Sequence, residues 1–241
     1  MTPPIAKPSG RFGKVARLTL RDQVVETLRN AILLGELPPG APVVEATLAR
    51  EFSVSRGPLR EAMRQLIDEG LLVTVRYTGT TVTQLSIEDI REIGSMRALL
   101  EAFAFELVWD RRDASFAAEL RRRHGVLTTA TLEGDEIGTI VAELDLHGLV
   151  YEASGHKLLQ ANWSGLRGRL QLYWSAHHRA HGSPGPQLNA HERYVEMALG
   201  DDLAAMKAEI SDHMRRGMQL TERLMQEAEH PAISTPMRRT R

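Results

Sequence analysis

A change of hydrophobic period at residues 71–84 is the feature that most constrains the fold. Leu71–Val75 and Thr80–Gln84 are rich in β-branched residues and flank a turn at Thr78-Gly79, a pattern typical of a β-hairpin. Three segments with helical periodicity precede it, at about residues 19–34, 45–52 and 55–70. Three helices followed by a hairpin predict a winged helix-turn-helix.

The rest of the chain predicts a second domain made of helices. From Ile87 to about Glu229 the apolar residues keep a helical spacing over six or seven segments. Ser86 and the acidic residues after it are a suitable helix start. We therefore expect a mainly α protein with four regions: a disordered arm (1–13), the winged helix-turn-helix (14–85), an all-helical bundle (86–229) and a disordered tail (230–241).

Composition and charge exclude several classes of protein. The chain has no cysteine, so disulfides, thiolate metal sites and cysteine nucleophiles are ruled out. No apolar run approaches the ~20 residues of a membrane helix, and no signal peptide is evident, so we expect a cytoplasmic protein without a membrane partner. Residues 1–85 carry a net charge of +3 and the remainder −4, which fits nucleic-acid contact at the N-terminal end.

The third helix has the features of a helix that reads DNA in the major groove. Leu59, Met63 and Leu66 form its apolar stripe. Arg56 and Arg60 lie four residues apart near its start, where such helices meet base edges and where arginine binds guanine. Further candidates for backbone or groove contacts are Arg50, Ser55, Gly57, Pro58, Arg64, Arg76, Thr78 and Gly79. An isolated row of arginines is more often a solvated face, so the assignment depends on the surrounding helices and wing.

Residues 18–84 resemble the GntR family of bacterial transcription regulators. The matching segments follow in the family's order: Ile32–Gly40, Glu45–Ala49, Val54–Ala62, Leu66–Leu71 and the wing residue Gly79. The resemblance implies base or phosphate contacts by Arg56, Gly57 and Arg60, with the wing in the minor groove. Ala46 is a departure, because some members have a DNA-contacting arginine there. We expect that contact to be missing.

Four side chains in the second half have the spacing of a metal site. Glu143 and His147 lie four residues apart on one helix face. His191 and His213 fall on two helices joined by a tight turn near Gly200, at about the same height. One carboxylate and three imidazoles suit Zn²⁺, Ni²⁺ or a similar ion, with positions left for water or a ligand. The Glu143–His147 pair alone would more often be ordinary packing.

Residues 87–225 resemble the FCD ligand-binding domain of the FadR branch of that family. The resemblance is carried by three segments: Met96–Glu101, Glu143–Gly155 and His191–His213. It implies Glu143, His147, His191 and His213 as metal ligands. The first ligand is normally Asp, so nearby Asp145 is an alternative, although side chains two residues apart on a helix diverge.

The same resemblance implies a small carboxylate effector at the open metal positions. Arg97 is similar to the arginine expected beside that pocket, and its guanidinium suits a carboxylate. An ion pair between Arg97 and Glu101, one turn on, is equally compatible with the sequence. His156 stands where such domains often have Asn, and it is a second candidate for effector contact.

Together these features predict a homodimeric transcription regulator. We expect a repressor whose binding to a palindromic double-stranded DNA operator is controlled by a small carboxylate at a divalent metal, zinc first and nickel next. The alternatives are a metal-dependent enzyme fused to a DNA-binding head and a metal-free ligand sensor. No nucleophile or general base appears as a motif, so we expect no enzyme activity. The effector's identity, the operator sequence and the direction of the response are not encoded in any motif.

Overall fold

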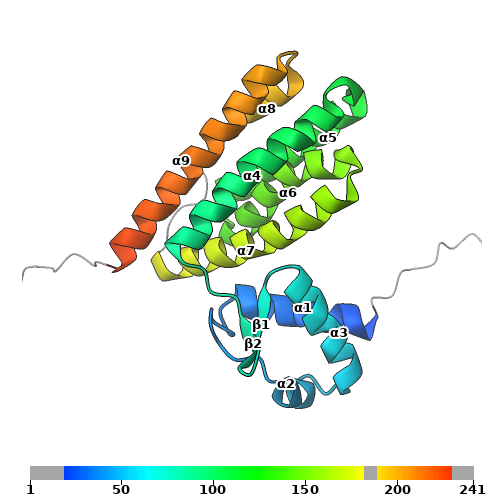
Figure 1. Ribbon diagram of the computed structural model, residues 1–241, viewed down its shortest axis with the longest axis vertical. Coiled ribbons are helices and arrows are strands. Elements are labelled where there is room, and N and C mark those ends of the chain that lie inside the picture. Colours follow the sequence, from blue (N-terminus) through cyan, green and yellow to red (C-terminus); the bar gives the residue numbers. More distant parts are fainter. Residues whose placement is uncertain (1–18, 182–188, 230–241) are drawn as a thin grey trace, which may run out of the picture.

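The computed structural model describes residues 19–181 and 189–229, and the predicted arm (1–13) and tail (230–241) lie outside them. In the described part the chain forms a small head and a bundle of longer helices (Figure 1). A winged helix-turn-helix is followed by six α-helices and one 3₁₀ turn, η1 (Trp109–Arg111). The predicted mainly α fold class is confirmed.

Three helices and a hairpin make up the head, which spans residues 19–82. Its elements are α1 (Leu20–Leu33), α2 (Glu45–Glu51), α3 (Arg56–Asp68), β1 (Leu72–Val75) and β2 (Gly79–Val82). Thr19 and Asp22 cap each other's backbone at the start of α1 in a capping box. Leu28, Leu59 and Leu66 are fully buried in the shared core. Because α3 buries this stripe, its opposite face is left on the surface.

The hairpin differs in detail from the expectation. Val75 pairs with Gly79, so the connecting loop is Arg76–Thr78 and not the predicted Thr78-Gly79. Tyr77 at the tip has φ +68°, and Gly79 has φ +96°. Two residues in the left-handed region close a tight turn between twisted strands, and only one of them is the expected glycine.

The second domain is a bundle in which α6 is the central helix. Its helices are α4 (Ile87–Val108), α5 (Ala114–Glu133), α6 (Glu136–Ser154), α7 (Lys157–His181), α8 (Glu192–Leu199) and α9 (Leu203–Glu229). Helix α6 contacts α4, α5 and α7, while α9 runs along α4 and α8 packs on α9 (Figure 1). Leu144 and Leu146–Tyr151 are buried. A helix that is apolar on all sides lies in the interior, and it carries His147 there.

The head packs against α7 through glycine. A Cβ added to Gly168 would lie 1.8 Å from the carbonyl oxygen of Glu69, just after α3, and one added to Gly70 would lie 2.7 Å from the carbonyl oxygen of Gly165. Leu172 of α7 is 1% exposed and belongs to the head's core. The end of α3 therefore rests directly on the α7 backbone, and close packing ties the positions of these two elements together.

Candidate metal centre and DNA-binding face

The four predicted metal ligands come together from three helices. Glu143 and His147 project from α6, His191 stands at the start of α8, and His213 lies on α9. One ligand atom from each lies within 4.8 Å of the others. The imidazole rings of His191 and His213 are 4.6 Å apart between centroids, and His147 lies 5.4 and 5.1 Å from them. The geometry is that of a site that could hold one metal ion.

Two of the imidazoles have buried nitrogen atoms that lack a partner in the described part of the chain. Nε2 of His147 and Nε2 of His191 make no hydrogen bond, and both side chains are almost fully buried. Nε2 of His191 is 3.5 Å from Oε1 of Glu143, at the limit for a hydrogen bond. Buried polar atoms without partners are costly. A divalent cation would satisfy both nitrogens and the carboxylate, so these donors fit the implied metal.

The surroundings keep two of the imidazoles, those of His147 and His213, in the neutral form that binds a metal. Burial and the positive charge of Arg97 hold the pKa of His147 well below its usual value. Burial and the neighbouring His147 do the same for the pKa of His213. Burial would raise the pKa of Glu143, but His191, His147 and Arg97 together outweigh it and the pKa is lowered. Neutral imidazoles and an ionised carboxylate are the protonation states that metal ions require.

Asp145, the alternative carboxylate, lies outside this cluster. It forms an ion pair with Arg167 of α7, and its side chain is 46% exposed. The divergence of side chains two residues apart explains why Glu143 and not Asp145 faces the histidines. The longer Glu side chain still brings its oxygen into the group.

Glu101 is a neighbour of the centre that the sequence suggested only as an ion-pair partner. This fully buried carboxylate on α4 lies with Oε1 2.7 Å from Nδ1 of His147 and accepts a hydrogen bond from the hydroxyl of Tyr194 at 2.7 Å. The three residues are far apart in sequence and come from α4, α6 and α8. The only signal for this role was the position of Glu101 in the Met96–Glu101 segment.

Arg97 is buried near the centre without an ionic partner among the described residues. Its Nε and Nη2 make no hydrogen bond, so the alternative of a direct Arg97–Glu101 ion pair is not what the structure shows. The guanidinium lies 5.4 Å from the ring centroid of Trp163 and 6.0 Å from that of Trp174, both on α7. A buried, aromatic-flanked guanidinium with free N–H groups is suited to bind an anion.

His156 has a different position from the one expected. It is exposed, its Nδ1 accepts a hydrogen bond from the backbone N–H of Leu159 at 3.2 Å, and its ring packs edge-on against Phe103. Its side chain thus caps the start of α7. The helix boundary that follows Gly155 turns the ring to the surface, and contact of His156 with an effector stays a prediction.

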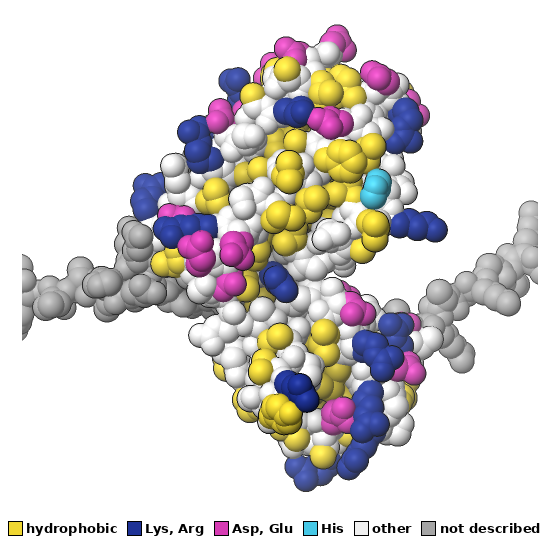
Figure 2. All heavy atoms as spheres, in the orientation of Figure 1, with side chains coloured by type: hydrophobic (Ala, Val, Ile, Leu, Met, Phe, Trp, Pro, Cys, Tyr) yellow, Lys and Arg dark blue, Asp and Glu magenta, His cyan; other side chains and the backbone are white. Residues whose placement is uncertain are grey.

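The candidate DNA-binding face is the exposed side of α3 and the wing. Figure 2 shows Lys and Arg side chains gathered along one edge of the head. The predicted residues that are exposed on it are Arg50, Ser55, Arg56, Gly57, Arg60, Arg64, Arg76, Thr78 and Gly79, while Pro58 is half-buried. Ser55 occupies the N-cap position of α3, as expected, but its side chain makes no capping hydrogen bond. Its hydroxyl and the first N–H groups of α3 are therefore available to a phosphate.

The arginines of this face differ in their partners. Nε of Arg60 forms an ion pair with Oε2 of Glu45 at 2.7 Å, whereas Arg56 and Arg64 have none among the described residues. An exposed pair contributes about 0–1 kcal/mol, so DNA could displace Glu45 at little cost. Arg76 lies over the ring of Tyr77 at 4.9 Å from its centroid, and that ring is 92% exposed. Tyr77 is a wing residue that sequence reasoning missed, although an aromatic residue beside Arg76 and Gly79 was a visible signal.

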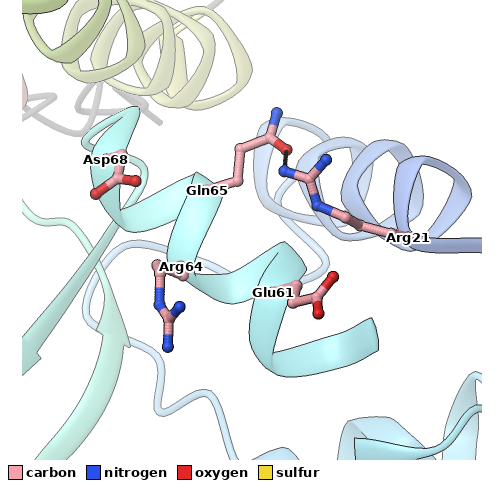
Figure 3. Close-up of a pocket in the computed structure, with 5 residues that line it drawn as sticks. All are labelled: Arg21, Glu61, Arg64, Gln65 and Asp68. Atoms are coloured by element: carbon pink, nitrogen blue, oxygen red, sulfur yellow. Dashed lines mark hydrogen bonds between the residues drawn. The ribbon is translucent and has the colours of Figure 1, made fainter. Parts of the chain in front are cut away.

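A shallow hollow of about 370 Å³ lies beside this face, between α1 and α3 (Figure 3). Arg21 donates a hydrogen bond to Oε1 of Gln65 at 2.6 Å across it. The other lining residues are Glu61, Arg64 and Asp68. Two arginines and two carboxylates give the hollow no net charge, so its charge favours neither an anion nor a cation.

Comparison with known proteins agrees with the two domains. Residues 20–82 match the family described as bacterial regulatory proteins, gntR family, and residues 92–216 match the FCD domain. An uncharacterized HTH-type transcriptional regulator, YdhC of Bacillus subtilis (strain 168), is 28% identical over 210 residues, which cover 85% of this chain and 92% of that protein. The gluconate operon transcriptional repressor of the same organism is 27% identical over 189 residues, covering 76% of this chain and 77% of the repressor.

The fold is also found among solved structures. The Escherichia coli protein McbR/YncC aligns with a TM-score of 0.72 at 20% identity, covering 87% of this chain and all of that one. None of the helices in residues 19–181 and 189–229 has the length and apolar character needed to span a membrane. The chain belongs to the GntR family of bacterial transcription regulators and joins the family's winged helix-turn-helix to an FCD domain of the FadR type.

Proposed function

We propose that this regulator is a repressor whose affinity for its operator is set by a small carboxylate bound at a metal centre. The observation that carries the proposal is the buried group Glu143, His147, His191 and His213, with the unpaired guanidinium of Arg97 nearby. The charge of Arg97 acts on His147 and His213, which indicates its proximity to the group. The similarity to a gluconate operon repressor supports a repressor role, and gluconate is itself a small carboxylate of the class that we propose as effector.

Each residue of the centre has a defined task in this proposal. Glu143 and the three histidines would hold a divalent ion, zinc before nickel by their donor set. When bound, the ion offers open coordination positions to carboxylate or hydroxyl oxygens. Arg97 would bind the effector's carboxylate, and the rings of Trp163 and Trp174 would exclude water from it. The centre acts in sensing and not in catalysis, in keeping with the regulator names of the relatives.

Helix α7 is the element that can carry the signal to the head. One side of it presents Trp163 and Trp174 to Arg97, and another side holds Gly168 against the carbonyl of Glu69. A carboxylate that draws Arg97 toward itself changes the packing of both tryptophans. A shift of α7 would then move the end of α3, because no space separates the two backbones.

The exposed apolar face of α4 is the surface that we assign to a second copy of the chain. Met96, Leu99 and Phe103 share one face of α4 and are 45%, 66% and 40% exposed, and Leu158 at the start of α7 is 72% exposed. Figure 2 shows hydrophobic side chains gathered over this part of the bundle. A contiguous apolar patch on a soluble regulator marks an interaction surface. A two-fold dimer through it would present two heads to the two halves of a palindromic operator in the cytoplasm.

Sedimentation of the wild type and of Leu99→Glu tests the dimer. We expect a dimer for the wild type and a monomer for the variant, since a charge at a self-complementary interface is placed there twice. Val126→Glu on α5, which is 49% exposed, is the matched control and should remain dimeric. A dimeric Leu99→Glu would show that the interface lies elsewhere.

The function itself is tested by operator binding at fixed salt. Full-length protein is compared as isolated, after chelation, and after Zn²⁺ is restored, with and without D-gluconate and related mono- and dicarboxylates. We expect at least one acid to change operator affinity about 5- to 150-fold, and only in the metal-loaded protein. An acid response that survives chelation would favour the metal-free sensor. Indifference to every acid, or turnover of one, would contradict the proposal.

A further inference from the structure

Glu101 connects two of the helices that supply the metal ligands. Its Oε1 lies 2.7 Å from Nδ1 of His147 on α6 and 2.7 Å from the hydroxyl of Tyr194 on α8. Tyr194 is one turn after His191 on the same helix start. All of these side chains are 0–2% exposed, so water does not compete for the hydrogen bonds. One carboxylate on α4 thus determines where parts of α6 and α8 lie.

The hydrogen bonds also select one form of the His147 ring. A neutral imidazole carries its proton on one nitrogen and a lone pair on the other. The Oε1 atom of Glu101 accepts a hydrogen bond from the hydroxyl of Tyr194, and a second acceptor interaction with His147 favours the imidazole proton on Nδ1. The lone pair is then on Nε2, the atom that has no hydrogen-bond partner in the described residues and faces the ligand cluster.

We propose that Glu101, oriented by Tyr194, is a positioning residue for the metal centre, which fixes His147 as the Nδ1–H tautomer with Nε2 directed at the ion. This role rests on the proposed metal site. Metal-bound histidines usually donate their second ring N–H to a carboxylate, and loss of that partner typically weakens metal binding 10- to 100-fold. Through Tyr194 the same carboxylate also fixes the turn of α8 that begins at His191.

Glu101 can be distinguished from a residue that only supports the fold. Its Oε2 is buried without a hydrogen bond in the described part of the chain. A buried, half-satisfied carboxylate does not stabilise the metal-free protein, and a neutral amide of the same shape should be tolerated there. The amide can turn either its oxygen or its NH₂ toward His147, so it no longer selects the tautomer. Glu101→Gln should therefore weaken metal binding without lowering the stability of the metal-free protein.

The experiment titrates chelator-stripped full-length protein with Zn²⁺ in competition with a chromophoric chelator. Wild type is compared with Glu101→Gln, Tyr194→Phe and the control Glu106→Gln, whose carboxylate on the same helix is 41% exposed and pairs with Lys207. We expect Zn²⁺ affinity to fall about 10- to 100-fold in Glu101→Gln, by a smaller factor in Tyr194→Phe and not at all in the control. Thermal unfolding without metal should be unchanged in Glu101→Gln and in the control, whereas Tyr194→Phe, which loses a buried hydrogen bond, should unfold at a somewhat lower temperature.

Nitrogen NMR of ¹⁵N-histidine-labelled, metal-free protein reports the tautomer directly, which a purely structural role of Glu101 would leave unchanged. The two-bond ¹H–¹⁵N couplings of the imidazole ring should show His147 as the Nδ1–H form in the wild type and as a mixture of both tautomers in Glu101→Gln. Equal Zn²⁺ affinity of wild type and Glu101→Gln, or an Nε2–H form in the wild type, would overturn the role of Glu101. If Glu101→Gln does not fold, Tyr194→Phe decides by the same criteria. A wild type that binds no Zn²⁺ would instead overturn the proposed metal centre itself.

Discussion

In the head, the side chains assigned to DNA lie on the surface, and in the helical domain the side chains assigned to the effector lie inside. Arg56 and Arg64 are solvated and have no ionic partner among the described residues. Arg97, His147 and His191 are 5% exposed or less, and they have nitrogen atoms without hydrogen bonds. Bulk water satisfies the first group, whereas the second group needs a bound ion, a ligand or an ordered water. The polar groups of the head are therefore satisfied before it binds DNA, and the helical domain is the part whose structure a bound ligand can change.

The largest effect should come from removal of a buried ligand. His147→Ala leaves the ion with three protein ligands and should weaken Zn²⁺ binding by on the order of 100-fold or more, since each protein ligand contributes to holding the ion. His156→Ala removes an exposed imidazole that only caps α7 and should leave Zn²⁺ affinity unchanged. Competition titration measures both. Equal Zn²⁺ affinities in the two variants would show that the buried His147 contributes no more to metal binding than the exposed His156.

The head should respond to substitution according to the task of each arginine. We expect Arg56 to contact base edges, so Arg56→Ala should cost about 1–3 kcal/mol on the operator and relax sequence preference. Arg64→Ala, one further turn along, should weaken binding to all sequences and reduce the salt dependence by about one phosphate contact. Titrations of operator and random DNA at several salt concentrations separate the two. If Arg56→Ala weakens binding to operator and random DNA equally, Arg56 contacts the DNA backbone and not the bases.

The contact between the end of α3 and helix α7 should be disrupted by the addition of a single methyl group. Gly168→Ala places a Cβ against the carbonyl of Glu69 and should destabilise the protein by about 1–3 kcal/mol, as overpacking does. Gly125→Ala on α5 meets open space and should stabilise by up to about 1 kcal/mol. Urea unfolding measures both changes. We also expect Gly168→Ala to alter the effector response of operator binding, and an unchanged response would exclude α7 as the connection.

The last prediction concerns pH. The pKa values of His147 and His213 lie well below 6.5 in the folded protein because burial disfavours the charged ring. Below pH 6.5 the unfolded chain takes up protons that the folded metal-free protein does not, so stability is full above that pH and falls as the pH drops toward the folded pKa values. Urea midpoints of chelator-treated protein from pH 7.5 to 5.5 test this. A midpoint that rises with acidification would contradict the burial of neutral imidazoles.

The sequence predicted what depends on spacing within one segment or on a recognisable family pattern. The exposed row Arg56, Arg60 and Arg64 follows from helical periodicity, and the grouping of Glu143 with His147 follows from their four-residue separation. Glu101 contacts His147, 46 residues further along the chain, and Tyr194, 93 residues further along. These contacts join three helices, and no local pattern encodes them. The packing of Gly168 on Glu69 is equally a property of the assembled fold.

Two local details could not be predicted for a different reason. The exposure of His156 is decided by where α7 begins, which sequence patterns place only to within a few residues. The turn of the wing is shifted because Tyr77 adopts a left-handed conformation that sequence patterns assign to glycine. In both cases the residue type could be read from the sequence, but the backbone conformation around it could not be predicted.

The central claim is that the buried centre and the exposed head are energetically coupled, and reciprocity tests it most directly. The factor by which an effector changes operator affinity must equal the factor by which the operator changes effector affinity. Isothermal titration of metal-loaded protein with the effector, with and without bound operator, gives the second factor. The account predicts two equal factors of about 5- to 150-fold that both vanish on chelation. An effector affinity that is the same with and without operator would contradict it.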